Sequence, residues 1–92
     1  MKVRLEAARW VTYHAAWRLG KARDIALDAS LTKLLVSEAL LDSAIDTVRT
    51  LGGYGIMVEY EVERALRDAV AGTLYSGTND LQRTIIARWL GL

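Results

Sequence analysis

Two glycine-containing turns carry the residues of this sequence that are best suited to contact a ligand. The first, LGGYG at residues 51–55, follows no predicted strand and matches neither a P-loop nor a GxGxxG nucleotide-binding fingerprint. It is typical of a helix stop, and its glycines let other groups approach the backbone closely. The second, SGTND at residues 76–80, opens a helix, and the free N–H groups of a helix N-terminus suit phosphate oxygens. The residues alone therefore indicate two candidate ligand-facing turns.

The composition argues against several other chemistries. The chain has no cysteine, which excludes disulfides and thiolate metal sites, and its one histidine, His14, provides no histidine metal cluster and disfavours Ser-His catalysis. With 12 Lys and Arg residues against 11 Asp and Glu residues, it lacks the dense basic face of a nucleic-acid binder. No apolar run approaches the roughly 20 residues that span a bilayer, and the start lacks a signal-peptide core. We therefore expect a cytoplasmic protein with no metal site, no nucleic-acid partner and no membrane span.

Four helices are predicted to position the two turns. They are expected at residues 2–19, at residues 25–51, at residues 60–71 and after Thr78, whose hydroxyl is a suitable N-cap. Asp80 then lies in the first turn of the last helix, where a carboxylate suits the positive end of the dipole. No alternating strand pattern or hairpin turn is present. The predicted fold class is all-α, an antiparallel four-helix bundle-like domain over residues 1–92.

These helices carry more apolar surface than they can bury among themselves. The domain is small, and 52% of its residues are hydrophobic. The first helix has an aromatic ridge at helical spacing, formed by Trp10, Tyr13, His14 and Trp17. The second helix has two apolar sides, one with Leu27, Leu31, Leu34, Leu41, Ile45 and Val48 and the other with Ile25, Ala29, Val36, Leu40 and Leu51. One side can face the domain's own core and the other needs a partner, so we expect self-association or packing against a larger chain.

Three stretches, read in order, resemble the C-terminal helical domain of the FAD-dependent acyl-CoA dehydrogenase family. YHAAWRLG at residues 13–20 is similar to the family's aromatic-Ala-Ala-Trp helix. RTLGGYGIMVEYEVERALRDA at residues 49–69 is similar to its Gly-Gly-x-Gly turn and Arg-Asp-Ala helix. LYSGTNDLQRTIIARWLGL at residues 74–92 is similar to its Tyr-Glu-Gly-Thr turn and closing Gln-Arg helix. The resemblance covers nearly the whole chain, and three motifs in order are far more specific than any one of them.

The resemblance implies a chemistry and a set of contacts. Members of the family remove two hydrogens across the Cα–Cβ bond of an acyl thioester, pass a hydride to FAD and deliver the electrons to an electron-transfer flavoprotein. The Gly-Gly turn of one subunit typically touches FAD that is held mainly by its neighbour. By that implication the cofactor contacts of this chain are Arg49, which replaces the usual Gln, together with Gly52, Gly53, Thr78 and Asp80. The implied substrate contacts are Tyr75 and Gly77.

Ser76 departs from the family pattern. It occupies the position of the glutamate that serves many members as the base, and a serine hydroxyl has no useful basicity near pH 7 without a partner base. Either the sequence belongs to one of the branches of the family that place the base on an earlier helix, which would lie upstream of Met1, or the site is inactive. The N-terminal helical domain and the middle β domain of the family are also absent. We therefore expect the isolated chain neither to bind FAD tightly nor to oxidise acyl thioesters.

Two functional hypotheses follow. The first is the C-terminal domain of an FAD-dependent dehydrogenase that acts on acyl-CoA or on a carrier-bound acyl group. The alternative is a non-enzymatic helical assembly subunit derived from the same fold, which the aromatic ridge and the two apolar sides of the second helix suit equally well.

Overall fold

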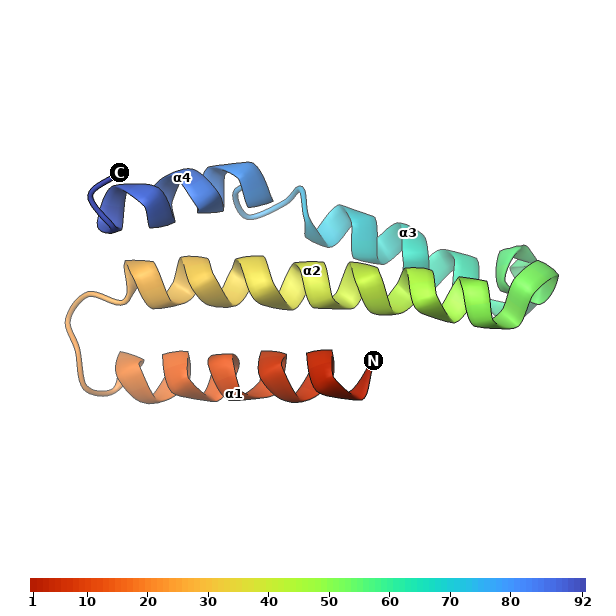
Figure 1. Ribbon diagram of the computed structural model, residues 1–92, viewed down its shortest axis with the longest axis horizontal. Coiled ribbons are helices and arrows are strands. Elements are labelled where there is room, and N and C mark those ends of the chain that lie inside the picture. The colour runs from red at the N-terminus through yellow and green to blue at the C-terminus, as the bar shows by residue number, and fades with distance from the viewer.

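The longest helix, α2 (Ala26–Leu51), is the element against which the other three α-helices pack. The computed structural model describes residues 1–92, and in it α1 (Lys2–Leu19) lies antiparallel along one side of α2. On the other side, α3 (Val62–Gly72) and α4 (Asn79–Trp89) follow one another along α2 (Figure 1). Helix α1 contacts neither α3 nor α4. The predicted all-α, antiparallel class is confirmed, with α2 as a shared central helix.

The ends of the helices follow from local chemistry. The carboxylate of Asp24 accepts a hydrogen bond from the Ala26 N–H at 2.9 Å, which satisfies one free donor at the start of α2. Helix α2 ends where Gly52 takes a positive φ of 57°. The predicted break is therefore confirmed, but the chain continues as two short 3₁₀ helices, η1 (Gly52–Ile56) and η2 (Val58–Tyr60), before α3. A Cβ atom at Gly55 would lie 2.6 Å from the Val48 carbonyl oxygen, so glycine is required there for η1 to fold back on α2.

Small residues make the contacts at the centre of the layer. Ser30, Ser37 and Ala44 recur every seven residues along α2, which is close to two helical turns, so they share one side of the helix. All three are buried, and Ser37 reaches α4. The other buried residues are Ala39, Gly55, Ala69, Gly72, Asn79 and Gln82. No large side chain is fully buried, because close approach of the helices leaves no room for one between them.

The large apolar side chains lie instead on the two wide faces of the layer. The molecule measures 47 × 23 × 18 Å, and the two apolar sides predicted for the second helix are both present. Neither side is buried in an internal core: Leu31 is 42% exposed on one and Leu40 is 54% exposed on the other. In the aromatic ridge of α1, Trp10 is 70% exposed and Trp17 is 60% exposed. Exposed apolar surface on this scale is typical of a face that packs against other protein.

Ion pairs attach α1 to α2 near both ends of α1. At its start, Arg4 Nη1 donates to Asp46 Oδ2 at 2.5 Å, and at its end Arg18 Nε donates to Asp28 Oδ2 at 3.3 Å. The hydrogen bond from Arg4 holds the pKa of Asp46 below its ordinary value, and the same bond raises the pKa of Arg4. Both side chains of this pair remain more than a third exposed, so solvent screens the attraction.

None of the helices is both long and apolar enough to cross a membrane.

The Arg4–Asp46 pair predicts a pH-dependent effect of one substitution. The lowered pKa of Asp46 means that its contribution to stability is present at neutral pH and is lost as the pH falls through the folded-state pKa. Arg4→Met should therefore lower the thermal unfolding midpoint at pH 7, and the difference from the unsubstituted protein should shrink below about pH 4. Arg88→Met, at an exposed arginine outside every ion pair of the chain, is the matched control. A difference for Arg4→Met that stays constant from pH 7 to pH 3 would contradict this interpretation.

Candidate functional site

The turn between α3 and α4 has the most constrained backbone in the molecule. Ser76 and Gly77 both lie in the left-handed region, at φ 55° and φ 82°. For a serine this conformation costs on the order of 1–3 kcal/mol and persists only where the surroundings enforce it. A Cβ atom at Gly77 would lie 2.7 Å from Nε2 of Gln82, so the second position accepts only glycine without a rearrangement. A left-handed serine followed by a position that requires glycine marks this turn as a functional candidate.

Hydrogen bonds from its own segment hold the turn. The buried Gln82 amide donates to the carbonyl oxygens of Ser76 and Gly77, both at 3.3 Å. Thr78 caps α4 as predicted, because its hydroxyl oxygen accepts from the Leu81 N–H at 3.2 Å. The Asn79 N–H donates to the Thr73 carbonyl oxygen at 3.0 Å, which closes the loop.

Two residues of α2 hold the same turn from outside its segment. The Lys33 ammonium donates to Asn79 Oδ1 at 2.7 Å, and the Ser37 hydroxyl lies 3.0 Å from the same oxygen. Neither residue belongs to a motif that the sequence singles out. A signal was present, because Lys33 interrupts the apolar side of the helix that contains Ala29, Val36 and Leu40.

An apolar groove of about 570 Å³ connects this turn with α1 across α2. Its walls include Ala15, Ala16 and Leu19 of α1 and Ile25, Ala29, Val36 and Leu40 of α2. Tyr75 and Ser76 form its rim at the turn, and Lys33 and Ser37 also line it. The groove contains hydroxyl groups and one cation but no carboxylate, so its own residues can bind a ligand and cannot act as a carboxylate base. No group of three or more His, Cys, Asp or Glu side chains in the chain is arranged to hold a metal ion.

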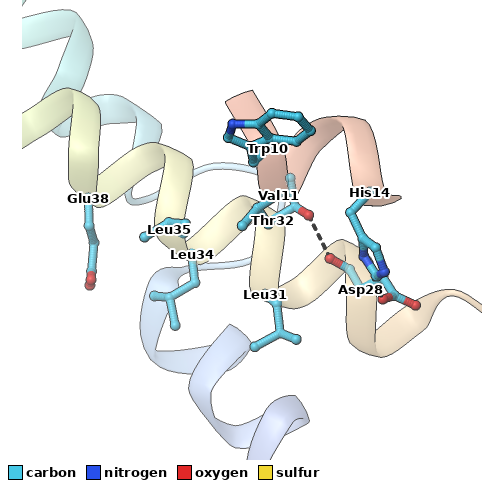
Figure 2. A pocket seen from close by; sticks show the side chains of 9 residues that line it. All are labelled: Trp10, Val11, His14, Asp28, Leu31, Thr32, Leu34, Leu35 and Glu38. Atoms are coloured by element: carbon cyan, nitrogen blue, oxygen red, sulfur yellow. Dashed lines mark hydrogen bonds and ion pairs between the residues drawn. The ribbon is translucent and has the colours of Figure 1, made fainter. Parts of the chain in front are cut away.

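A second groove, of about 690 Å³, lies between α1 and α2 beside Trp10 (Figure 2). Its apolar lining comes mainly from Leu31, Leu34 and Leu35. Its titratable residues are already paired. Asp28 contacts Arg18 and lies 3.7 Å from His14 Nδ1, and Glu38 pairs with Arg83. None of the site residues expected from the sequence lines it, and we therefore assign the candidate site to the first groove and its turn.

The predicted site residues form two separate clusters. Tyr75, Ser76, Gly77 and Thr78 are together in the α3–α4 turn, with Asp80 just inside α4, where its side chain is 98% exposed and lies 3.6 Å from Arg83. Arg49, Gly52 and Gly53 lie at the far end of α2, beyond the whole length of α3 (Figure 1). Eleven helical residues place the two clusters about 16 Å or more apart. One chain therefore does not bring all of the predicted cofactor residues together.

The backbone of Gly52 and Gly53, after the end of α2, is accessible to other groups. A Cβ atom at Gly52 or at Gly53 would meet no atom within 4 Å. Arg49 is exposed and takes part in none of the ion pairs within the chain. The end of α2 thus offers free backbone and an unpaired cation to a group from elsewhere.

Comparisons with known proteins identify the family of the chain. The family model described as "Acyl-CoA dehydrogenase, C-terminal domain" matches residues 1–91. An acyl-CoA dehydrogenase of Bacillus subtilis is 44% identical over 90 residues, which are 98% of this chain and 24% of that protein. An L-prolyl-[peptidyl-carrier protein] dehydrogenase of Pseudomonas fluorescens is 44% identical over 92 residues, which are 100% of this chain and 24% of that protein.

A solved structure gives the same assignment for the fold. The FAD complex of PigA superposes with a TM-score of 0.94 at 40% identity, covering 100% of this chain and 24% of that one. The chain thus spans about a quarter of the length of the proteins it matches. Because the family model matches residues 1–91, nearly the whole chain, the chain belongs to the acyl-CoA dehydrogenase family, as its C-terminal domain.

Proposed function

We propose that residues 1–92 contribute the C-terminal domain to a flavin-dependent enzyme that introduces an α,β double bond into an acyl thioester. The observation that carries this proposal is the match over the whole chain to dehydrogenases of this kind. The thioester carrier is CoA or a carrier protein, because an acyl-CoA dehydrogenase and a prolyl-carrier dehydrogenase are equally similar to the chain, at 44% identity.

FAD is the proposed cofactor, and the exposed end of α2 fits one part of it. Gly52 and Gly53 leave open space beside their backbone, and Arg49 supplies a free positive charge one turn earlier. Open backbone beside a cation suits a phosphate-bearing group. When bound, FAD supplies the hydride acceptor, while these residues hold its phosphate region. Thr78 still has a hydroxyl proton to donate, and Asp80 offers carboxylate oxygens to a hydroxyl group rather than to a phosphate.

The proposed substrate contacts lie at the groove beside the α3–α4 turn. Tyr75 and Ser76 line the groove, Gly77 follows them in the strained turn, and the apolar walls suit the carbon chain of an acyl group. Proton abstraction from the α-carbon requires a base, and no carboxylate lines this groove. We therefore infer that the base comes from a segment outside these 92 residues, and that the chain alone is inactive.

Assembly is part of the proposal. The exposed aromatic ridge and the two apolar faces of α2 favour packing against a second copy or against a larger dehydrogenase chain. The proposed electron acceptor of the complete enzyme is an electron-transfer flavoprotein, as the family resemblance implies. A second candidate function, a non-enzymatic helical assembly subunit, is favoured by one specific observation, which is that only nine residues of the chain are buried.

Purification of the native product separates the two candidates. A polypeptide that contains this sequence, isolated from its source cells, should be several times longer than 92 residues or should co-purify with such a chain. It should also carry flavin and lose the flavin absorbance when an acyl thioester is added. The 92-residue chain by itself should retain no flavin. A colourless homo-oligomer of the short chain would instead favour the assembly subunit, and stoichiometric flavin on the isolated chain would contradict the proposed division of the site.

The proposed phosphate contact of Arg49 predicts the effect of a charge reversal. Arg49→Glu in the flavin-loaded protein should weaken FAD binding by about tenfold or more, since a charged hydrogen bond contributes on the order of 1.5–3 kcal/mol. Arg49→Gln, which keeps a donor without the charge, should have a smaller effect. The apparent Kd from flavin fluorescence measures both, with Arg88→Glu as a matched control on exposed charge. Equal FAD affinity for Arg49→Glu and Arg88→Glu would remove Arg49 from the cofactor site.

A further inference from the structure

We propose that Lys33 is a positioning residue that fixes the Tyr75–Thr78 turn against α2. The proposal rests on the proposed function for its catalytic consequence and on the hydrogen bonds of the chain for its structural one. Lys33 is half-buried, and its ammonium donates to the buried side chain of Asn79 at 2.7 Å. No carboxylate of the chain pairs with it.

Placing an ammonium group in this half-buried position is energetically unfavourable. Its partial burial removes water that stabilises the charge, and a neutral amide oxygen compensates less well than a carboxylate. An apolar side chain would match the neighbouring Val36 and Leu40 on the same side of α2 without that cost. The hydrogen bond to Asn79 is therefore the interaction by which Lys33 positions the turn.

Asn79 links the hydrogen bond from Lys33 to the backbone of the turn. It is the first residue of α4, and its backbone N–H donates to the Thr73 carbonyl oxygen at 3.0 Å, so fixing Asn79 fixes both ends of the loop. The other bonds of the loop, made by Thr78 and Gln82, come from the same segment and set its internal shape only.

Lys33 and Ser37 hold the loop against α2, because both contact Asn79 Oδ1. The Ser37 hydroxyl lies 3.0 Å from Asn79 Oδ1, 2.7 Å from the Lys33 carbonyl oxygen and 3.2 Å from the Leu34 carbonyl oxygen, so three acceptors compete for its single proton. The bond from Lys33 is therefore the persistent one. It determines where the strained Ser76–Gly77 backbone sits relative to the groove that Lys33 and Tyr75 both line.

This arrangement sets the placement of the proposed substrate contacts. A misplacement of about 1 Å near reacting atoms reduces rates by about a hundredfold. Loss of the Lys33 anchor should accordingly slow the chemistry in molecules that are still folded and still hold flavin. A lysine with a purely structural role would change stability alone.

The test compares two bonds between the same pair of helices. Lys33→Met removes the anchor of the turn, whereas Glu38→Gln weakens the Glu38–Arg83 pair, which joins the same two helices but includes no residue of the loop. Both are made in the full-length flavin-loaded protein, and flavin reduction is followed after mixing with butyryl-CoA or a prolyl-loaded carrier protein. Lys33→Met should reduce the reduction rate by about tenfold or more, Lys33→Arg should restore part of it, and Glu38→Gln should leave it unchanged.

A double-mutant cycle and hydrogen exchange make the outcome decisive. Asn79→Ala should produce the same loss, and Lys33→Met with Asn79→Ala should lose no more than either alone. Amide exchange over residues 73–79 should accelerate in Lys33→Met and not in Glu38→Gln, whether or not the protein is a dehydrogenase. Unchanged exchange in this loop, or additive effects of the two substitutions, would overturn the role of Lys33. Accelerated exchange in a protein that holds no flavin and reacts with neither thioester would uphold the anchor and refute the proposed function instead.

Discussion

Close packing of α2 through small side chains is the constraint on which the rest of the structure depends. Serine and alanine at seven-residue intervals, with glycine on the elements opposite, let three rows of backbone lie side by side. The same close approach sends the leucines, isoleucines and tryptophans to the two wide faces. The result is an elongated layer whose helices are held by ion pairs and polar contacts at a few points and whose large apolar side chains are exposed.

This architecture explains why the proposed site is divided. The strained α3–α4 turn is held by Lys33 to the first third of α2, while the open glycines follow the end of α2 on the far side of α3. Each cluster presents its groups outward, so each is suited to complete a site with another chain or segment. The groove beside Ser76 shows the same incompleteness in chemical terms, since it offers walls and a cation without a base.

Much of this fold could be predicted from residue patterns, because the spacing of apolar residues in a helix and the glycines that end helices are local features of the sequence. The break after Leu51, the Thr78 cap and the two apolar sides of α2 are all present. The 3₁₀ helices after Gly52 were not predicted, because the fold of η1 against Val48 depends on a tertiary contact at Gly55. The role of Lys33 was also missed, because its partner Asn79 is 46 residues away and neither residue belongs to a recognised motif. Neither side of α2 is buried in an internal core, because small residues rather than leucines occupy the seams between the helices.

The most direct measurement is the thermal unfolding of the isolated 92-residue chain, followed by circular dichroism over a wide range of concentrations. It shows whether the layer of helices can fold without association. A layer without large buried side chains depends on association for its stability, so the unfolding midpoint should rise with concentration, and light scattering should show an assembly wherever the helices are formed. A monomer that unfolds cooperatively at a midpoint independent of concentration would contradict the account, because the chain would then contain a sufficient core of its own.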